Sequence, residues 1–296
     1  MTGDLGDAKQ QSKFLAFRAF LLIHVGAETA MSIHRALREN IYASPLGDMH
    51  LYVWIPLLAA CALGLKRRWG RRATAVCTGL LFVDAVLLFP DASNHSFVEF
   101  LCLGAVTLLD LGNVEQRVIL GRGLRGLLVI ILFYSGLQKV LYGTYFDGQF
   151  LGHLIAAEDR FAYLFQWLLP GEEFARLRGL GGFPTVWGAP LPDGSYRVDA
   201  PLLVACSNLT YIAEMGLAIL LLIPRTRTPA VWGTVLLIVA IELGAREITF
   251  GVLMLNLVLL FHPRDLIRPL LPYVGLGYAY LLASRIGLVA GFEFHA

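Results

Sequence analysis

Charged residues are scarce in this chain of 296 residues. Only 16% of its residues are Asp, Glu, Lys or Arg, whereas 57% are hydrophobic. Soluble globular domains carry about 25% charged and about 45–50% apolar residues. We therefore expect an integral membrane protein that crosses the bilayer several times.

A concentrated basic surface is also missing. The net charge is +2, from 24 basic and 22 acidic residues spread along the chain. Proteins that bind nucleic acid usually gather Lys and Arg on one face. We expect no nucleic-acid partner. The expected partner is a membrane lipid or a small hydrophobic substrate, and the sequence identifies no protein partner.

Cysteines are few and isolated, each within an apolar segment: Cys61, Cys77, Cys102 and Cys206. They form no CxxC pair, and no His, Cys or Asp group has the spacing of a metal site. The sequence therefore predicts neither a disulfide framework nor a metal centre. We expect the cysteines to pack in the core.

The sequence consists mainly of long apolar segments. A membrane-crossing helix needs about 20 predominantly apolar residues. We predict an all-α fold, a polytopic transmembrane helix bundle of eight or nine spans. The expected spans lie near 14–35, 49–65, 73–90, 95–111, 124–142, 200–223, 229–246, 248–262 and 270–290. The first is expected to be a retained helix rather than a signal peptide.

Basic loops predict the orientation. The motif KRRWGRR at 66–72 should be cytoplasmic, because cytoplasmic loops carry an excess of Lys and Arg. Alternation then places the N-terminus in the cytoplasm. Arg264 and Arg268 also fall inside, provided that the apolar run at 230–262 crosses twice. Two crossings of that run are therefore favoured.

We expect one transmembrane domain over 1–296. Its longest connection, at 143–200, should be extracytoplasmic. Residues 150–180 alternate apolar and charged residues at helical spacing, which predicts an interfacial helix. The turn-forming stretch that follows, at 181–195, predicts a lid.

Polar residues inside the predicted spans gather toward the outer leaflet. A charge at bilayer depth costs about 2.5–3.5 kcal/mol, so such residues usually face a bundle interior and mark reactive sites. We predict a polar cavity that opens toward the extracytoplasmic side, with Lys139 and His95 as candidate catalytic residues. The candidate substrate-binding residues are His24, Glu28, Asn94, Glu99, Tyr134, Gln138, Glu214, Glu242 and Arg246.

Structural ion pairs are the alternative interpretation of these charges. Lys139 would then pair with Glu99 or Glu214, and Arg246 with Glu242. Asp84, alone in its span, is interpreted as structural.

Lys139 is the most informative of these residues. Burial disfavours a charged amine, and a neutral amine can accept a proton, which a guanidinium cannot. Ser135 and Gly136 keep the neighbouring face of the helix narrow, which leaves room for a ligand or a close helix.

Two segments carry a resemblance to a known family. NHSFVEFLCLGAVTLLDLGN at 94–113 and LLVIILFYSGLQKVLYGTYFDGQFL at 127–151 resemble the transmembrane core of the vitamin K-dependent gamma-carboxylase and its bacterial relatives with the HTTM domain. ITFGVLMLNLVLLF at 248–261 is similar to a later helix of that family. The family's aromatic and lysine pattern is filled here by Tyr134, Gly136, Lys139, Tyr145 and Gly148.

The resemblance implies that Lys139 is the base that deprotonates reduced vitamin K, with His95 beside the quinone ring. It implies reduced vitamin K or another isoprenoid quinol as cofactor and no metal. The carboxylase grips its peptide with a large lumenal region, and this sequence ends at Ala296 without one. We therefore expect a small membrane-soluble substrate, an isoprenoid quinol or another prenyl lipid.

Three other functions stay open. A non-oxidative cyclase or isomerase of an isoprenoid would use Glu99, Glu214 or Glu242 as an acid. A proton-coupled transporter would relay protons along His24, Glu28, His95 and Glu99, and a passive assembly scaffold needs no chemistry. Dependence on dioxygen and a quinone separates the oxidative enzyme from the cyclase.

Overall fold

The chain folds entirely into helices and their connections over the residues that the structure, a computed structural model, describes. These residues are 2–39, 45–66, 68–89, 94–180, 194–245 and 247–289. The structure has 82% helix, and the described ranges contain no strand. The predicted all-α class is confirmed.

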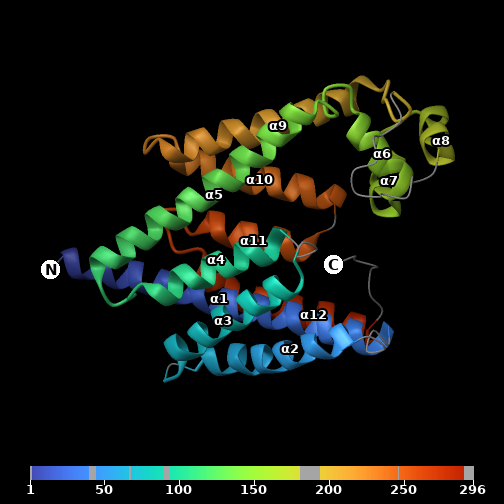
Figure 1. Cartoon of the computed structure of the whole chain (residues 1–296). Coiled ribbons are helices and arrows are strands. Elements are labelled where there is room, and N and C mark those ends of the chain that lie inside the picture. Colours follow the sequence, from blue (N-terminus) through green and yellow to red (C-terminus); the bar gives the residue numbers. More distant parts are fainter. Residues whose placement is uncertain are drawn as a thin grey trace. The chain divides into compact units, whose positions relative to one another are not determined.

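Figure 1 shows the helices in chain order. Their bounds are α1 Thr2–Glu39, α2 Pro45–Gly64, α3 Gly70–Leu87, α4 Asn94–Leu108, α5 Val114–Tyr142, α6 Gln149–Ala157, α7 Asp159–Phe165, α8 Gly171–Leu180, α9 Pro201–Leu222, α10 Arg227–Ala245, α11 Ile248–Leu259 and α12 Ile267–Arg285. Each of the nine predicted spans overlaps one of the helices α1–α5 and α9–α12.

Four helices are long and apolar enough to cross a membrane: those with spans at Asp7–Arg38, Val114–Tyr142, Pro201–Leu222 and Arg227–Gly244. Three further apolar helical segments are shorter, at His50–Gly64, His95–Leu108 and Ile248–Leu259. The structure therefore supports a membrane protein with four candidate spanning helices among its described residues.

The apolar run at 230–262, for which two crossings were expected, forms two helices. The helix α10 ends at Ala245 and α11 begins at Ile248. With 12 residues and a rise of about 1.5 Å per residue, α11 is about 18 Å long. A bilayer's hydrocarbon core is about 30 Å thick, so α11 is shorter than a full span.

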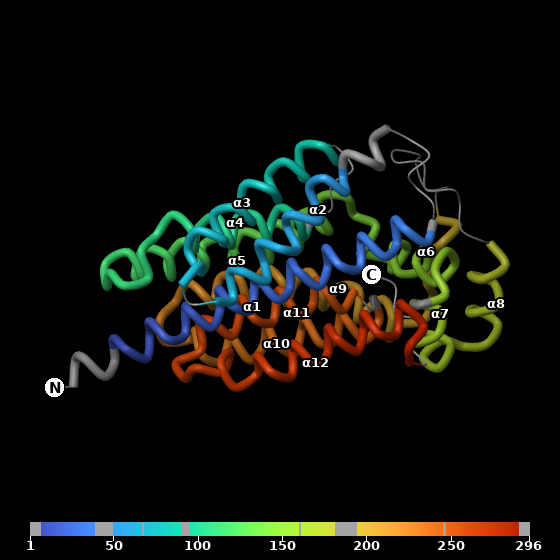
Figure 2. Tube along the Cα trace, turned by 90° about the horizontal axis from the view of Figure 1, so that it is seen from below, coloured from blue at the N-terminus to red at the C-terminus, as the bar shows by residue number. Residues whose placement is uncertain are grey.

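The chain divides into two compact units. The first comprises the residues up to Arg125 and those from Thr249 onward, hence α1–α4, the start of α5, α11 and α12. Within it α1 packs against α2, α4 and α12, and α3 packs against α2 and α4. Figure 2 shows α12 running along α1, so the two ends of the sequence share one bundle.

The second unit comprises the rest of α5 and the helices α6–α10. Within it α9 packs against α10, and α6 packs against α7 and α8. Gly136 lets α5 approach α9 closely, because a Cβ there would lie 2.6 Å from Cγ of Met215 and 2.9 Å from the carbonyl oxygen of Tyr211. The sequence predicted either room for a ligand or a close helix beside Gly136, and the structure shows the close helix.

The predicted extracytoplasmic segment holds three short helices in place of one. The extended backbone at Glu158 separates α6 from α7, and α8 begins after Pro170. Buried apolar side chains join them to the start of α9, among them Ile155, Leu177 and Leu203. Most of the predicted lid, at 181–193, lies outside the described residues.

Three of the four cysteines pack in the core as expected. Cys61, Cys77 and Cys102 are buried and free, and the sulfurs of Cys61 and Cys77 lie 3.6 Å apart. Cys206 on α9 differs from the expectation, because it is exposed. An exposed cysteine on an apolar helix is at no disadvantage where that helix faces lipid.

Candidate functional site

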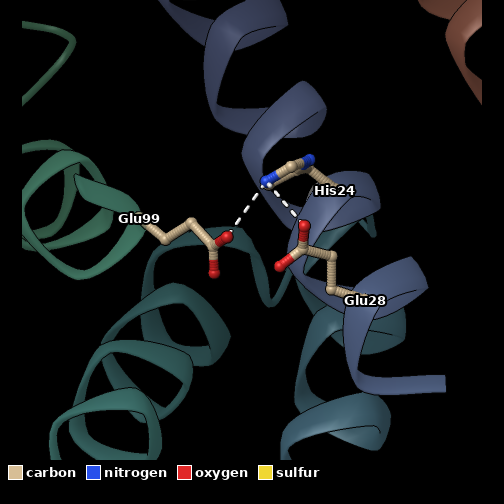
Figure 3. Close-up of side chains that lie close together, drawn as sticks. All are labelled: His24, Glu28 and Glu99. Atoms are coloured by element: carbon tan, nitrogen blue, oxygen red, sulfur yellow. Dashed lines mark hydrogen bonds and ion pairs between the residues drawn. The ribbon is translucent and has the colours of Figure 1, made fainter. Parts of the chain in front are cut away.

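A buried polar cluster lies at the centre of the first unit. The helix α1 supplies His24 and Glu28, and α4 supplies Glu99 (Figure 3). Nε2 of His24 lies 3.1 Å from Oε1 of Glu99 and 3.8 Å from Oε1 of Glu28. The side chains of His24 and Glu99 are 0% and 3% exposed, and that of Glu28 is 21% exposed. We call these three residues the His24 cluster.

Local sequence explains how these groups meet. His24 and Glu28 are one helical turn apart on α1, so they share a face. The ring of Phe20, one turn earlier, stacks on the His24 imidazole with ring centroids 5.6 Å apart. Packing of α4 against α1 then brings Glu99 to the same face.

Two further residues lie beside the cluster on other helices. The hydroxyl of Tyr278 on α12 hydrogen-bonds Nδ1 of His24. Thr249, at the start of α11, lies near the Glu28 carboxylate. The sequence analysis missed both residues. Tyr278 carried one signal, a polar aromatic tip within an apolar segment, but its partner could not be read from the sequence.

The arrangement is suited to proton transfer or to binding a cation. The imidazole of His24 lies between the two carboxylates and is in reach of both (Figure 3). Donor atoms of His24, Glu28 and Glu99 all lie within 4.8 Å of one another, close enough to hold a metal ion. Three of the residues predicted to bind substrate are therefore brought together.

His95 lies on the edge of this region. Its ring packs on that of Phe250 with centroids 5.4 Å apart, and it precedes Glu99 by one turn of α4. The side chain of Asn94, which precedes it, lies outside the described residues. The structure thus places His95 with the first unit's polar residues.

The second unit contains its own buried ion pair. Nζ of Lys139, in the last turn of α5, donates to both carboxylate oxygens of Glu214 on α9, each at 2.8 Å. Nζ also donates to Oγ of Ser135 at 2.7 Å, and that hydroxyl lies 3.2 Å from Oε1 of Glu214. The side chains of Lys139 and Glu214 are 16% and 5% exposed. This is one of the two ion pairs expected for Lys139 in the structural interpretation.

Tyr145 completes the surroundings of the amine. Nζ of Lys139 lies 5.4 Å from the centroid of its ring, a distance at which the ring face attracts a cation. The loop is tied to α9 by Ser207, whose hydroxyl donates to the Tyr145 carbonyl at 2.8 Å. Burial, and then the Glu214 charge, raise the pKa of Tyr145. The phenol therefore stays neutral beside the pair.

The remaining candidates stand apart from these contacts. Gln138 is half-buried, and Tyr134 is 56% exposed on α5. Glu242 is half-buried on α10, whereas Arg246, its expected partner, lies outside the described residues. Asp84 accepts a hydrogen bond from Nε1 of Trp54 at 2.8 Å, which fits the structural role expected for it.

An apolar pocket of about 360 Å³ lies between α3 and α4 in the first unit. Its lining residues are Phe82, Ala85, Val86, Phe89, Phe97 and Phe100. Such a lining suits a hydrocarbon chain. The side chains that line it offer no group for acid–base chemistry.

Comparisons with protein-family models, curated proteins and solved structures find no match for the chain. The resemblance to the vitamin K-dependent gamma-carboxylase family therefore stays a prediction from the motifs at 94–113 and 127–151.

Proposed function

We propose that the protein is an integral membrane enzyme that performs acid–base chemistry on a lipid-soluble quinol or another prenyl lipid. In this proposal eight or nine helices cross the bilayer, the N-terminus is cytoplasmic, and the reactive end of α5 faces the extracytoplasmic side. The apolar composition and the four candidate spanning helices support a membrane location.

One observation carries the proposal: the contacts of Lys139. Its amine meets a carboxylate, a hydroxyl and an aromatic face within one turn of the end of α5. A charge pair at membrane depth is costly, and such pairs are usually found where a substrate or ion is handled. These are also the residues around which the resemblance is strongest.

The pair divides the proton chemistry between two groups. The resemblance assigns the proton to the lysine amine, but a carboxylate at 2.8 Å favours the charged form of an amine. We therefore assign the Glu214 carboxylate as acceptor of the quinol O–H proton, and the Lys139 ammonium as the charge that stabilises the resulting quinolate. The phenolic bond that breaks and the carboxylic O–H that forms balance the step.

The role of His95 follows from its own unit. Its contact with Phe250 and its place one turn before Glu99 on α4 support a part in the first unit's polar network. We therefore do not include His95 in the proton transfer at the Lys139–Glu214 pair.

Reconstituted protein tests this function. Vesicles containing the chain and reduced vitamin K are followed for dioxygen uptake and for the quinone epoxide by mass spectrometry. Loss of a general acid–base group typically lowers the rate by about 10²–10⁴-fold. We expect falls of that size for Lys139→Met and Glu214→Gln. The control Lys66→Met, at the exposed end of α2, should keep the natural rate.

The other outcomes are equally informative. Consumption of an isoprenoid substrate without dioxygen, still dependent on Glu214, would replace the oxidative enzyme by the cyclase or isomerase. A natural chain that turns over no added quinol or isoprenoid, and carries the same co-purifying lipids as Lys139→Met, would overturn the proposal in favour of a scaffold.

A further inference from the structure

We propose that the His24 cluster is a binding site for a divalent first-row transition-metal ion such as Zn²⁺. The ligands are Nε2 of His24 and one carboxylate oxygen each from Glu28 and Glu99. The inference goes beyond the proposed function, because the site lies in the first unit and uses none of the residues of the Lys139–Glu214 pair.

The spacing of the donor atoms is the first argument. Two ligand atoms bound at about 2.0–2.2 Å to a tetrahedral ion lie about 3.3–3.6 Å apart. Nε2 of His24 is 3.1 Å from Glu99 and 3.8 Å from Glu28, and all three donor atoms lie within 4.8 Å of one another. An ion can therefore enter once the two carboxylates adjust their rotamers to close around it.

Charge is the second argument. The carboxylates of Glu28 and Glu99 gather around the single imidazole of His24 (Figure 3). One imidazole supplies at most a single positive charge against two carboxylates. Two buried carboxylates are costly to ionise side by side without a compensating cation. A divalent ion held by the three donor atoms would balance both carboxylates.

The support around the ligands is the third argument. Metal-binding histidines usually engage their other ring nitrogen in a hydrogen bond, which fixes the ring and its tautomer. The Tyr278 hydroxyl occupies that position at Nδ1 of His24, so Nε2 is the nitrogen that faces the carboxylates (Figure 3). Three helices, α1, α4 and α12, thus supply the ligands and this supporting bond.

The donor set indicates the kind of ion. One imidazole and two carboxylates are borderline and hard ligands, which suit Zn²⁺, Mn²⁺ or Fe²⁺. Three protein ligands leave a position for water or substrate, as in catalytic rather than structural zinc sites. Sequence spacing could not show this site, because Glu99 is contributed by a distant segment.

Metal analysis of the purified full chain tests the site. The protein is stripped with a chelator in detergent, loaded with Zn²⁺, freed of excess by gel filtration and measured by elemental mass spectrometry. We expect one zinc ion per chain, and a loss of that ion in Glu99→Gln and Glu28→Gln. Tyr278→Phe should weaken binding by about 10–100-fold, as removal of such supporting bonds usually does.

Controls separate this site from adventitious binding. Asp84→Asn removes a buried acid that lies 3.4 Å from His50 in the same unit, and Glu214→Gln removes the acid of the other unit. Both variants should keep the zinc ion. Equal zinc in these controls and in Glu99→Gln would overturn the proposal, as would a natural chain that binds none.

A second measurement uses only the natural chain, so it does not depend on the folding of any variant. Co²⁺ bound by the natural chain at low coordination gives visible absorption bands, and added Zn²⁺ should abolish them. Featureless spectra from the Co²⁺-loaded natural chain would contradict a protein-bound ion. The proposal can therefore fail without any mutant.

Discussion

Lys139 and Glu214 show how a pair of residues can carry opposite charges inside an apolar unit. Their side chains are mostly buried and joined by two hydrogen bonds of 2.8 Å. Desolvation of two charges offsets much of their attraction, so the intact pair adds little to stability. Loss of one partner is different, because it leaves the other charge buried alone.

A double-mutant comparison tests this at residue level. We expect Lys139→Met to lower the free energy of unfolding by about 3–5 kcal/mol, because Glu214 is left unpaired. The double variant Lys139→Met/Glu214→Leu should recover most of that loss. Thermal unfolding in detergent measures both. A double variant no more stable than the single one would show that the pair is not the cause.

Tyr278 offers a second residue-level prediction. Tyr278→Phe leaves Nδ1 of the buried His24 without its hydroxyl partner, and an unsatisfied buried polar group costs about 1–3 kcal/mol. Tyr273→Phe on the same helix is the matched control, because Tyr273 is 71% exposed. We expect a lower unfolding temperature for Tyr278→Phe alone. Equal shifts would mean that the hydrogen bond contributes nothing.

At the scale of elements, the contact between α5 and α9 depends on the missing side chain of Gly136. A Cβ at this position would lie 2.6 Å from Met215 and 2.9 Å from a backbone oxygen. Gly126, ten residues earlier on α5, has open space around it. One substitution made at both positions therefore separates packing from helix propensity.

We expect Gly136→Ala to destabilise the chain by about 1–3 kcal/mol, because the helices must move apart. Gly126→Ala should be neutral or stabilising by up to about 1 kcal/mol, since alanine is the better helix former. Thermal unfolding again measures the difference. A neutral Gly136→Ala would show that α9 can shift, and the Lys139–Glu214 distance would then have to change as well.

At the scale of the molecule, orientation in the membrane is the property to establish. The positive-inside rule places the loop at 66–72 in the cytoplasm and the segment at 143–200 outside. Arg68 and Arg197 are exposed positions in these two segments. The exposed Cys206 must first be replaced by serine, whereas the other cysteines are buried.

Labelling of intact cells with a membrane-impermeant maleimide measures which side of the membrane each cysteine faces. Arg197→Cys should react in intact cells, and Arg68→Cys only after the membrane is opened. The reverse pattern would invert the topology and place the end of α5 on the cytoplasmic side. Reaction of both in intact cells would contradict an odd number of crossings between them.

Much of the fold follows from residue periodicity and composition. The nine predicted apolar spans each overlap one of the helices α1–α5 and α9–α12, and charge favoured dividing the run at 230–262 in two. The breaks within 150–180 were missed, because alternating apolar and charged residues also fit one continuous helix. The sequence did not predict which residues contact each other. Lys139 had two candidate acids, and Tyr278 and Thr249 were not candidates at all.

Local chemistry determines which segments become apolar helices and which of them carry polar groups, because helical propensity and transfer from water act on each segment independently. Which acid meets which base depends on helix packing, because rotation of a helix about its axis turns a side chain toward a different neighbour. Glu99 reached His24 through the contact of α4 with α1, and Glu214 reached Lys139 through the approach of α9 to Gly136. Only the tertiary structure could decide these pairs, because their members are distant in the sequence and have no local interaction that selects one partner.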